Sequence, residues 1–262
     1  MTVSSSSVVS KLPALTFLFW VMKIAATTLG ETAGDLLSMT LNVGYLVSTV
    51  ILMSGFAVVL VGQLRAKRYI PFLYWAVILA TSTAGTTMSD FMNRTVGLGY
   101  ATGSAILLGL LIGVLIAWRL TEKSLSVDDV RSLRAESFYW SAILVSNTLG
   151  TSLGDYLADD SGLGFAGGAA VIGGVIVLIV AIYFIAKRTG LGSTSLNVGL
   201  FWAAFVLTRP LGATMGDVLT KTPEQGGLGF GTIGSSAVLA VVLVATVLYT
   251  TWRGEATGQA EK

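Results

Sequence analysis

The sequence contains no cysteine and no histidine, and these two absences narrow the chemistry open to it. Without cysteine, the chain can form no disulfide, no thiolate metal site and no cysteine nucleophile. Without histidine, it lacks the commonest zinc ligand and the usual general base or pH switch. Only pairs of carboxylates remain for acid–base catalysis, and no hydrolase motif accompanies them. We therefore expect neither enzyme activity nor a bound cofactor.

Charge is also scarce. Charged residues make up 11% of the 262 residues and hydrophobic residues make up 53%, whereas soluble domains carry about 25% charged residues. This composition indicates an integral membrane protein, with the lipid bilayer as its surroundings and a single membrane domain over residues 1–262. The net charge is only +2, and no basic run points to nucleic acid as a partner.

One pattern occurs four times along the chain. A Trp is followed by a Gly ten residues later and by an Asp 15 residues later. The four sets are Trp20, Gly30, Asp35; Trp75, Gly85, Asp90; Trp140, Gly150, Asp155; and Trp202, Gly212, Asp217. A later Gly, followed by an aromatic residue, completes each copy: Gly44, Gly99, Gly164 and Gly229. Self-similarity at fixed offsets indicates one structural unit repeated four times, at about 12–66, 67–121, 132–190 and 194–253.

Each repeat holds two apolar segments long enough to cross a bilayer, which takes about 20 residues. The expected spans are 14–36, 43–64, 71–92, 98–118, 138–157, 163–186, 196–219 and 228–252. They predict an all-α bundle of eight transmembrane helices, built from four parallel two-helix repeats. Such repeats can surround a pseudo-fourfold axis or pair as two halves. The first helix of each repeat is interrupted by polar residues, so it should face protein or water rather than lipid.

The basic residues predict the orientation. Twelve of the 16 Lys and Arg residues fall on one side of the expected spans, and only Arg94 and Lys221 fall on the other. Cytoplasmic loops carry the excess of Lys and Arg, so both termini should be cytoplasmic. We interpret the four repeated Trp residues as anchors at the membrane interface rather than as a binding cage.

A polar stripe runs along the first helix of each repeat. The positions 7, 11 and 15 residues after each Trp lie on one helical face. They are Thr27, Glu31, Asp35; Ser82, Thr86, Asp90; Asn147, Thr151, Asp155; and Arg209, Ala213, Asp217. Lys23 lies one turn before Thr27. A charge at the bilayer centre costs at least about 2.5 kcal/mol, so these groups need partners. We expect Arg209 to pair with a carboxylate of another repeat, for which Glu31 is a candidate.

The charges of this stripe do not balance. Five carboxylates face two cations, Lys23 and Arg209, which leaves −3. Either some carboxylates hold protons, or a cation binds, or the Asp residues reach water. The first two outcomes predict a pathway for a small cation or proton. The third makes the Asp residues structural caps or links between helices. The pathway would use Lys23, Thr27, Glu31, Asp35, Asp90, Asn147, Asp155, Arg209 and Asp217.

A metal ion bound in this stripe would have only oxygen ligands. The candidate metal ligands are Glu31, Asp35, Asp90, Asp155 and Asp217. A site made only of oxygen suits Mg²⁺, Ca²⁺ or Mn²⁺ and suits copper or zinc poorly.

Two stretches of the stripe resemble a bacterial family of membrane-anchored proteins built from four tandem two-helix repeats of unknown function. They are Lys23-x-x-x-Thr27-Thr28-x-Gly30-Glu31-x-x-Gly34-Asp35 and Thr208-Arg209-Pro210-Leu211-Gly212-Ala213-Thr214-x-Gly216-Asp217. The resemblance implies eight helices and a bacterial inner (cytoplasmic) membrane location, and it implies no reaction. The second repeat departs from the pattern, because Ser89 stands where the other copies have a glycine.

The leading hypothesis from the sequence is a secondary transporter of a hard divalent cation such as Mn²⁺. Export is the favoured direction, and proton coupling is one version of the hypothesis. A second hypothesis is a binding or sensing membrane protein whose charges form a structural network. A third is an organic-ion carrier in which Lys23 and Arg209 hold a substrate carboxylate. The oligomeric state and the continuity of the first helices stay open.

Overall fold

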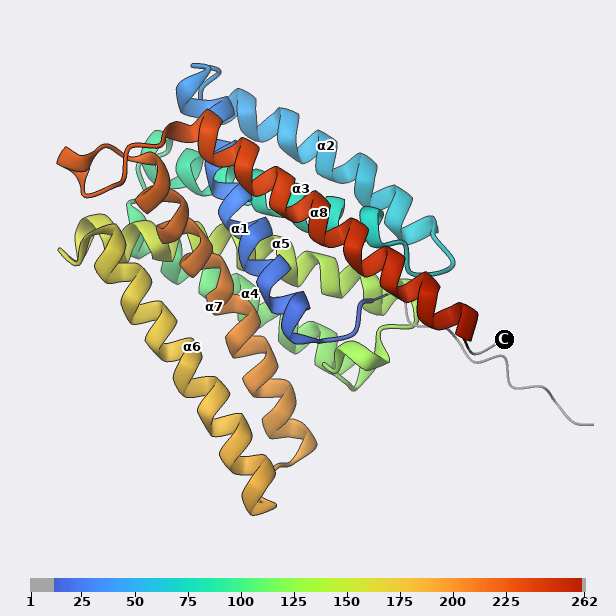
Figure 1. Ribbon diagram of the computed structural model, residues 1–262. Coiled ribbons are helices and arrows are strands. Elements are labelled where there is room, and N and C mark those ends of the chain that lie inside the picture. The colour runs from blue at the N-terminus through green and yellow to red at the C-terminus, as the bar shows by residue number, and fades with distance from the viewer. Residues whose placement is uncertain (1–11, 261–262) are drawn as a thin grey trace, which may run out of the picture.

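Helices make up nearly the whole of this computed structural model, which describes residues 12–260 (Figure 1). Within that range there are eight α-helices and no strand. They are α1 (Phe17–Asp35), α2 (Tyr45–Arg65), α3 (Pro71–Asp90), α4 (Tyr100–Glu122), α5 (Leu133–Asp155), α6 (Gly164–Thr189), α7 (Thr194–Thr220) and α8 (Gly231–Ala260). The predictions of an all-α chain and of two helices in each repeat are confirmed.

The helices pack in a cyclic order. The first helices of the repeats form a closed ring, in which α1 and α5 each pack against both α3 and α7. The second helices lie outside this ring, each against the first helix of the next repeat: α2 on α3, α4 on α5, α6 on α7 and α8 on α1. The same neighbour relation therefore recurs four times, and the last repeat closes onto the first.

The glycine ten residues after each Trp allows the helices of the ring to approach closely. Each such glycine faces the residue seven after the Trp of the next repeat. The pairs are Gly30 with Ser82, Gly85 with Asn147, Gly150 with Arg209, and Gly212 with Thr27. A Cβ added at Gly85 would lie 3.0 Å from backbone atoms of α5. Because small residues let membrane helices come into backbone contact, this packing explains why the glycine is repeated.

The first helices are continuous, and three of them end in the same way. α1 runs unbroken through Gly30, and α7 runs through both Pro210 and Gly212. A five-residue π-helical turn follows α1, α3 and α5, at Leu36–Thr40, Phe91–Thr95 and Tyr156–Asp160. The caps Gly44 and Gly99 then adopt φ of 81° and 72° with ψ of 158° and 155°. Only glycine readily adopts this conformation, so the second repeated glycine meets a backbone requirement.

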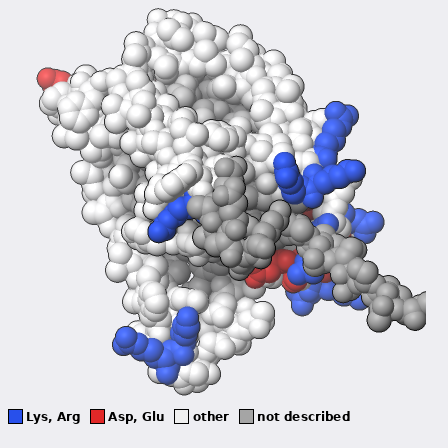
Figure 2. Space-filling view, turned by 45° about the vertical axis from the view of Figure 1, so that its right-hand side comes forward, with Lys and Arg blue, Asp and Glu red and all other residues white. Residues whose placement is uncertain are grey.

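The two sets of helices differ in their surroundings. Five helices are long and apolar enough to cross a membrane: α2, α4, α6, α7 and α8. Between 11% and 22% of the apolar window of each outer helix is buried, against 50% for α7. The exposed basic side chains lie at the right, near the middle and at the lower left of Figure 2, and the upper left of that view shows none. The long, apolar and exposed outer helices indicate a multi-pass membrane protein.

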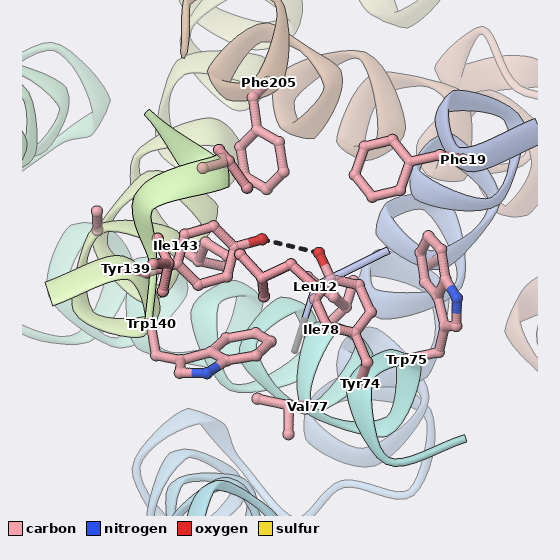
Figure 3. Packing of buried hydrophobic residues seen from close by; sticks show 14 of the residues in the cluster. Leu12, Phe19, Tyr74, Trp75, Val77, Ile78, Tyr139, Trp140, Ile143 and Phe205 are labelled. Atoms are coloured by element: carbon pink, nitrogen blue, oxygen red, sulfur yellow. Dashed lines mark hydrogen bonds between the residues drawn. The ribbon is translucent and has the colours of Figure 1, made fainter. Parts of the chain in front are cut away.

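Aromatic side chains fill the end of the ring where its helices begin, which we call the aromatic end. Its centre is made by Tyr74, Trp75, Tyr139, Trp140 and Trp202, all buried. The hydroxyls of Tyr74 and Tyr139 point toward each other and form a hydrogen bond of 2.8 Å (Figure 3). The interpretation of the repeated Trp residues as interface anchors is wrong for Trp75, Trp140 and Trp202, because their rings pack against other aromatic rings inside the protein.

Candidate functional site

The polar stripes of α1, α3, α5 and α7 all face the interior of the ring. None of the twelve stripe residues is more than 4% exposed. Their equal offsets from the repeated Trp place them at successive levels along the ring. Thr27, Ser82, Asn147 and Arg209 share one level, and Glu31, Thr86, Thr151 and Ala213 share the next. The four aspartates form a third, which we call the aspartate level: Asp35, Asp90, Asp155 and Asp217.

The guanidinium of Arg209 joins all four repeats. Its Nη2 lies 2.8 Å from Oε2 of Glu31 and 2.6 Å from the hydroxyls of both Thr86 and Thr151. These two hydroxyls also lie 3.3 Å from the same Glu31 oxygen. The fourth repeat has the small Ala213 at this level. The guanidinium of Arg209, which lies one turn earlier in α7, fills the space that a polar side chain occupies in the other three repeats. The expected pairing of Arg209 with Glu31 is confirmed.

At the aspartate level the four carboxylates form two pairs, each with one cation. Lys221 Nζ lies 3.0 Å from Asp35 and 3.2 Å from Asp217. Arg94 lies 3.0 Å from Asp90 and 3.9 Å from Asp155. The carboxylate oxygens in the two Arg94 contacts form no hydrogen bond, so Arg94 holds its aspartates only by charge.

Arg94 and Lys221 divide the four equivalent aspartates into two pairs, so the aspartate level has lower symmetry than the helices. Each stands four residues after an aspartate, Arg94 after Asp90 and Lys221 after Asp217. The first and third repeats have Met39 and Asp159 at that position. Burial by itself lowers the pKa of Lys221, but Asp217 and Asp35 raise it above its ordinary value. Lys221 therefore stays protonated at neutral pH.

These contacts revise the charge balance drawn from the sequence. The balance of −3 did not count Arg94 and Lys221, whose side chains both contact aspartates of the aspartate level. Adding their two positive charges gives a balance of −1. The remaining charge is unevenly distributed. Four aspartates with two cations leave −2 at the aspartate level. Toward the aromatic end, the carboxylate of Glu31 and the two cations Arg209 and Lys23 sum to a net charge of +1.

Three of the five expected metal ligands come together. Glu31, Asp35 and Asp217 each offer a carboxylate oxygen within 4.8 Å of the other two, and all three residues are buried. The ammonium of Lys221 already contacts two of them. Asp90 and Asp155 lie instead with Arg94. The three clustered carboxylates could hold a hard cation, because such ions prefer oxygen ligands.

The remaining expected site residues lie toward the aromatic end. Lys23 Nζ is fully buried, has no hydrogen-bond partner and lies 4.3 Å from the centroid of the Phe205 ring. The hydroxyl of Thr27 contacts the carbonyl of Thr208 at 3.2 Å, so it links α1 to α7. Asn147 donates from Nδ2 to the hydroxyl of Thr81 at 2.8 Å.

A family model described as Repeat of Unknown Function (DUF347) matches four segments of the chain, 18–69, 73–124, 138–189 and 200–255. Together these segments cover most of the sequence. The chain belongs to this family. Each match covers most of the two helices of one repeat, which confirms the resemblance to four tandem repeats of unknown function. Neither a curated protein nor a solved structure matches the chain.

Sequence reasoning missed four participants in the site. Arg94 and Lys221 were placed outside the membrane helices, although their spacing of four residues from an aspartate is the spacing at which helical side chains meet. Thr86 and Thr151 were recognised in the stripe but left out of the expected site. Their position 11 residues after the Trp, the same as that of Glu31, was the signal that could have included them.

Proposed function

We propose that this DUF347 protein is a secondary transporter of a hard divalent cation such as Mn²⁺, with export as its direction and protons as the coupling ion. The observation that carries the proposal is the buried cluster of Glu31, Asp35 and Asp217, whose carboxylate oxygens lie within 4.8 Å of one another. Hard divalent cations take carboxylate and other oxygen ligands. The proposal includes no enzymatic step.

In this proposal all eight helices cross a bacterial inner membrane, with pseudo-fourfold symmetry about the ring axis. The recurring neighbour relation among the helices supports the symmetry. α1, α3 and α5 need not be apolar all round, because the outer helices shield them from lipid. The aromatic end lies on the side of the basic loops, which makes it cytoplasmic together with both termini.

The charges suggest how binding and release would alternate. The aspartate level carries −2, so one divalent cation would neutralise it. Lys221 contacts Asp35 and Asp217 in the structure, and an entering cation would displace its ammonium from them. Glu31 would exchange the guanidinium of Arg209 for the cation, since it belongs to both groups. Protonation of the carboxylates would then weaken their hold on the ion and allow its release.

The direct test is Mn²⁺ flux into proteoliposomes, with Mg²⁺, Ca²⁺ and Zn²⁺ for comparison. Wild type is compared with Glu31→Gln and with Asp128→Asn, a matched control at an exposed acidic residue of the loop before α5. We expect saturable Mn²⁺ flux that is lost in Glu31→Gln and kept in Asp128→Asn. Absence of flux for every ion, with all three proteins folded, would refute cation transport.

A second candidate is a binding or sensing protein whose charges form a structural network. The contact of Arg209 with side chains from three other repeats favours it. Under this candidate, Glu31→Gln lowers thermal stability while neither wild type nor variant moves an ion. An organic-ion carrier using Lys23 and Arg209 has less support, because both side chains are fully enclosed and leave little room for an organic substrate.

A further inference from the structure

Several fully buried polar atoms without hydrogen-bond partners lie at the level of Arg209 and one helical turn nearer the aromatic end. They are Lys23 Nζ, Arg209 Nε and Nη1, Ser82 Oγ and Asn147 Oδ1. All four side chains are 0% exposed. A buried polar group without a partner is costly, and an unpaired ammonium is the most costly of these. So many of them in one place point to a ligand that satisfies them.

Two observations indicate that these atoms lie near one another. Ser82, Asn147 and Arg209 occupy the same level of the ring, seven residues after the Trp of their repeats. Lys23 lies one turn nearer the aromatic end, against the ring of Phe205, which precedes Arg209 by one turn of α7. The hydroxyl of Thr27 links these positions, because it lies 3.0 Å from the carbonyl oxygen of Lys23 and 3.2 Å from that of Thr208, the residue before Arg209.

Among the described residues, Glu31 is the one carboxylate that forms an ion pair with either cation, and it does not compensate both. Glu31 contacts Arg209 through Nη2, which leaves the Nε and Nη1 groups without an acceptor. Lys23 has no ion pair, and its ammonium lies only against the face of an aromatic ring. Attraction between a cation and an aromatic ring is weaker than the cost of burying the charge. One positive charge therefore remains uncompensated in this part of the ring.

We propose that a small monovalent anion binds here, between the ammonium of Lys23 and the Nε and Nη1 groups of Arg209, with the hydroxyl of Ser82 as a neutral donor. One negative charge cancels the excess of +1. The enclosure of all the ligands restricts the anion to the size of a halide or of the smallest carboxylates. Asn147 is not a ligand, because its free atom is an acceptor and its Nδ2 is held by Thr81.

This anion site shares no ligand with the cation cluster and does not depend on cation transport. Two of the cation ligands, Asp35 and Asp217, lie at the far end of the stripe, and the third, Glu31, joins the two sites through its contact with Arg209. If both proposals hold, the ring binds one divalent cation at the level carrying −2 and one anion at the part carrying +1. Failure of Mn²⁺ flux would leave the anion site standing.

The test is the anion dependence of thermal stability in the purified full-length protein. The protein is exchanged into gluconate, which is too large to enter, and titrated at constant ionic strength with chloride, bromide, formate or acetate. We expect a saturable rise in Tm, since a ligand that binds only the folded state stabilises it. A response to the halides alone identifies an inorganic anion, and a response to formate or acetate identifies a small carboxylate.

Two variants separate this site from general salt effects. Lys23→Met should remove the dependence on the anion, and it should fold, because it deletes an unpaired buried charge. Lys187→Met, at an exposed residue at the end of α6, should keep the full dependence. Equal Tm values in gluconate and in every small anion would overturn the proposal, as would an unchanged anion dependence in Lys23→Met.

A crystal grown in bromide locates the site independently of any variant. Anomalous scattering from bromide should give a peak between the side chains of Lys23 and Arg209. Bromide peaks confined to the protein surface would contradict the assignment.

Discussion

The aspartate level and the aromatic end are built on the same four repeats but handle charge in opposite ways. The aspartate level has an identical carboxylate from every repeat, and Lys221 and Arg94 compensate it from the helix ends, where their side chains are 18% and 35% exposed. Toward the aromatic end, Lys23 comes from a single repeat and is fully buried without a hydrogen-bond partner. The repeated residues therefore form the scaffold, and the departures from the repeat supply the charges that distinguish the two parts.

The largest expected effect on stability comes from breaking the Glu31–Arg209 ion pair, which lies between the aspartate level and the aromatic end. Arg209→Met leaves Glu31 buried without its cation, so the free energy of unfolding should fall by about 3–5 kcal/mol. Chemical unfolding in detergent measures this loss. The double variant Glu31→Gln/Arg209→Met should recover much of it, and Arg188→Met, at an exposed position, should change little. A single variant as stable as wild type would show that the pair adds nothing to stability.

At the aspartate level, Lys221→Met should cost less, about 1.5–3 kcal/mol, because its bonds to carboxylates lie at the partly exposed end of the ring. The folded-state pKa of Lys221 is raised, so its contribution is complete below the unfolded pKa of about 10.4 and declines as the pH rises through the folded pKa. Melting curves of wild type and variant should therefore differ by a constant amount from pH 6 to 9. A difference that vanished at neutral pH would mean that Lys221 is not held charged there.

The scaffold shared by both parts can be tested at the repeated glycine. Gly85→Ala places a methyl group 3.0 Å from the backbone of α5, and such overpacking costs about 1–3 kcal/mol. Gly109→Ala in α4 is the matched control, because a Cβ there meets nothing within 4 Å. Thermal unfolding of the two variants gives the comparison. Equal stability would argue against close contact between α3 and α5.

The smallest expected effect lies at the aromatic end. Tyr74→Phe removes the hydrogen bond to the Tyr139 hydroxyl and should lower the free energy of unfolding by about 1 kcal/mol. Tyr183→Phe, at a partly exposed position of α6, serves as the control for loss of a hydroxyl. If Tyr74→Phe had the same Tm as wild type, the hydrogen bond between the two hydroxyls would contribute nothing measurable to stability.

Much of the fold could be predicted because its signals are local. Apolar segments of about 20 residues and polar positions spaced by four residues are read directly along the chain. The pairing of Arg209 with Glu31 was also within reach, since a buried cation needs a carboxylate. The Trp residues were misjudged because an aromatic ring near a helix end can face either lipid or protein, and the local sequence is the same in both cases.

The sequence by itself determined the four repeats, the eight helices and the burial of one polar face on α1, α3, α5 and α7. It could do so because helical periodicity and the cost of polar groups in hydrocarbon act on each segment separately. The tertiary structure alone decided that Arg94 serves both Asp90 and Asp155, that Asp35 and Asp217 share Lys221, and that Lys23 is left without a partner. The physical reason is that such neighbours come from different repeats and meet only when the ring closes.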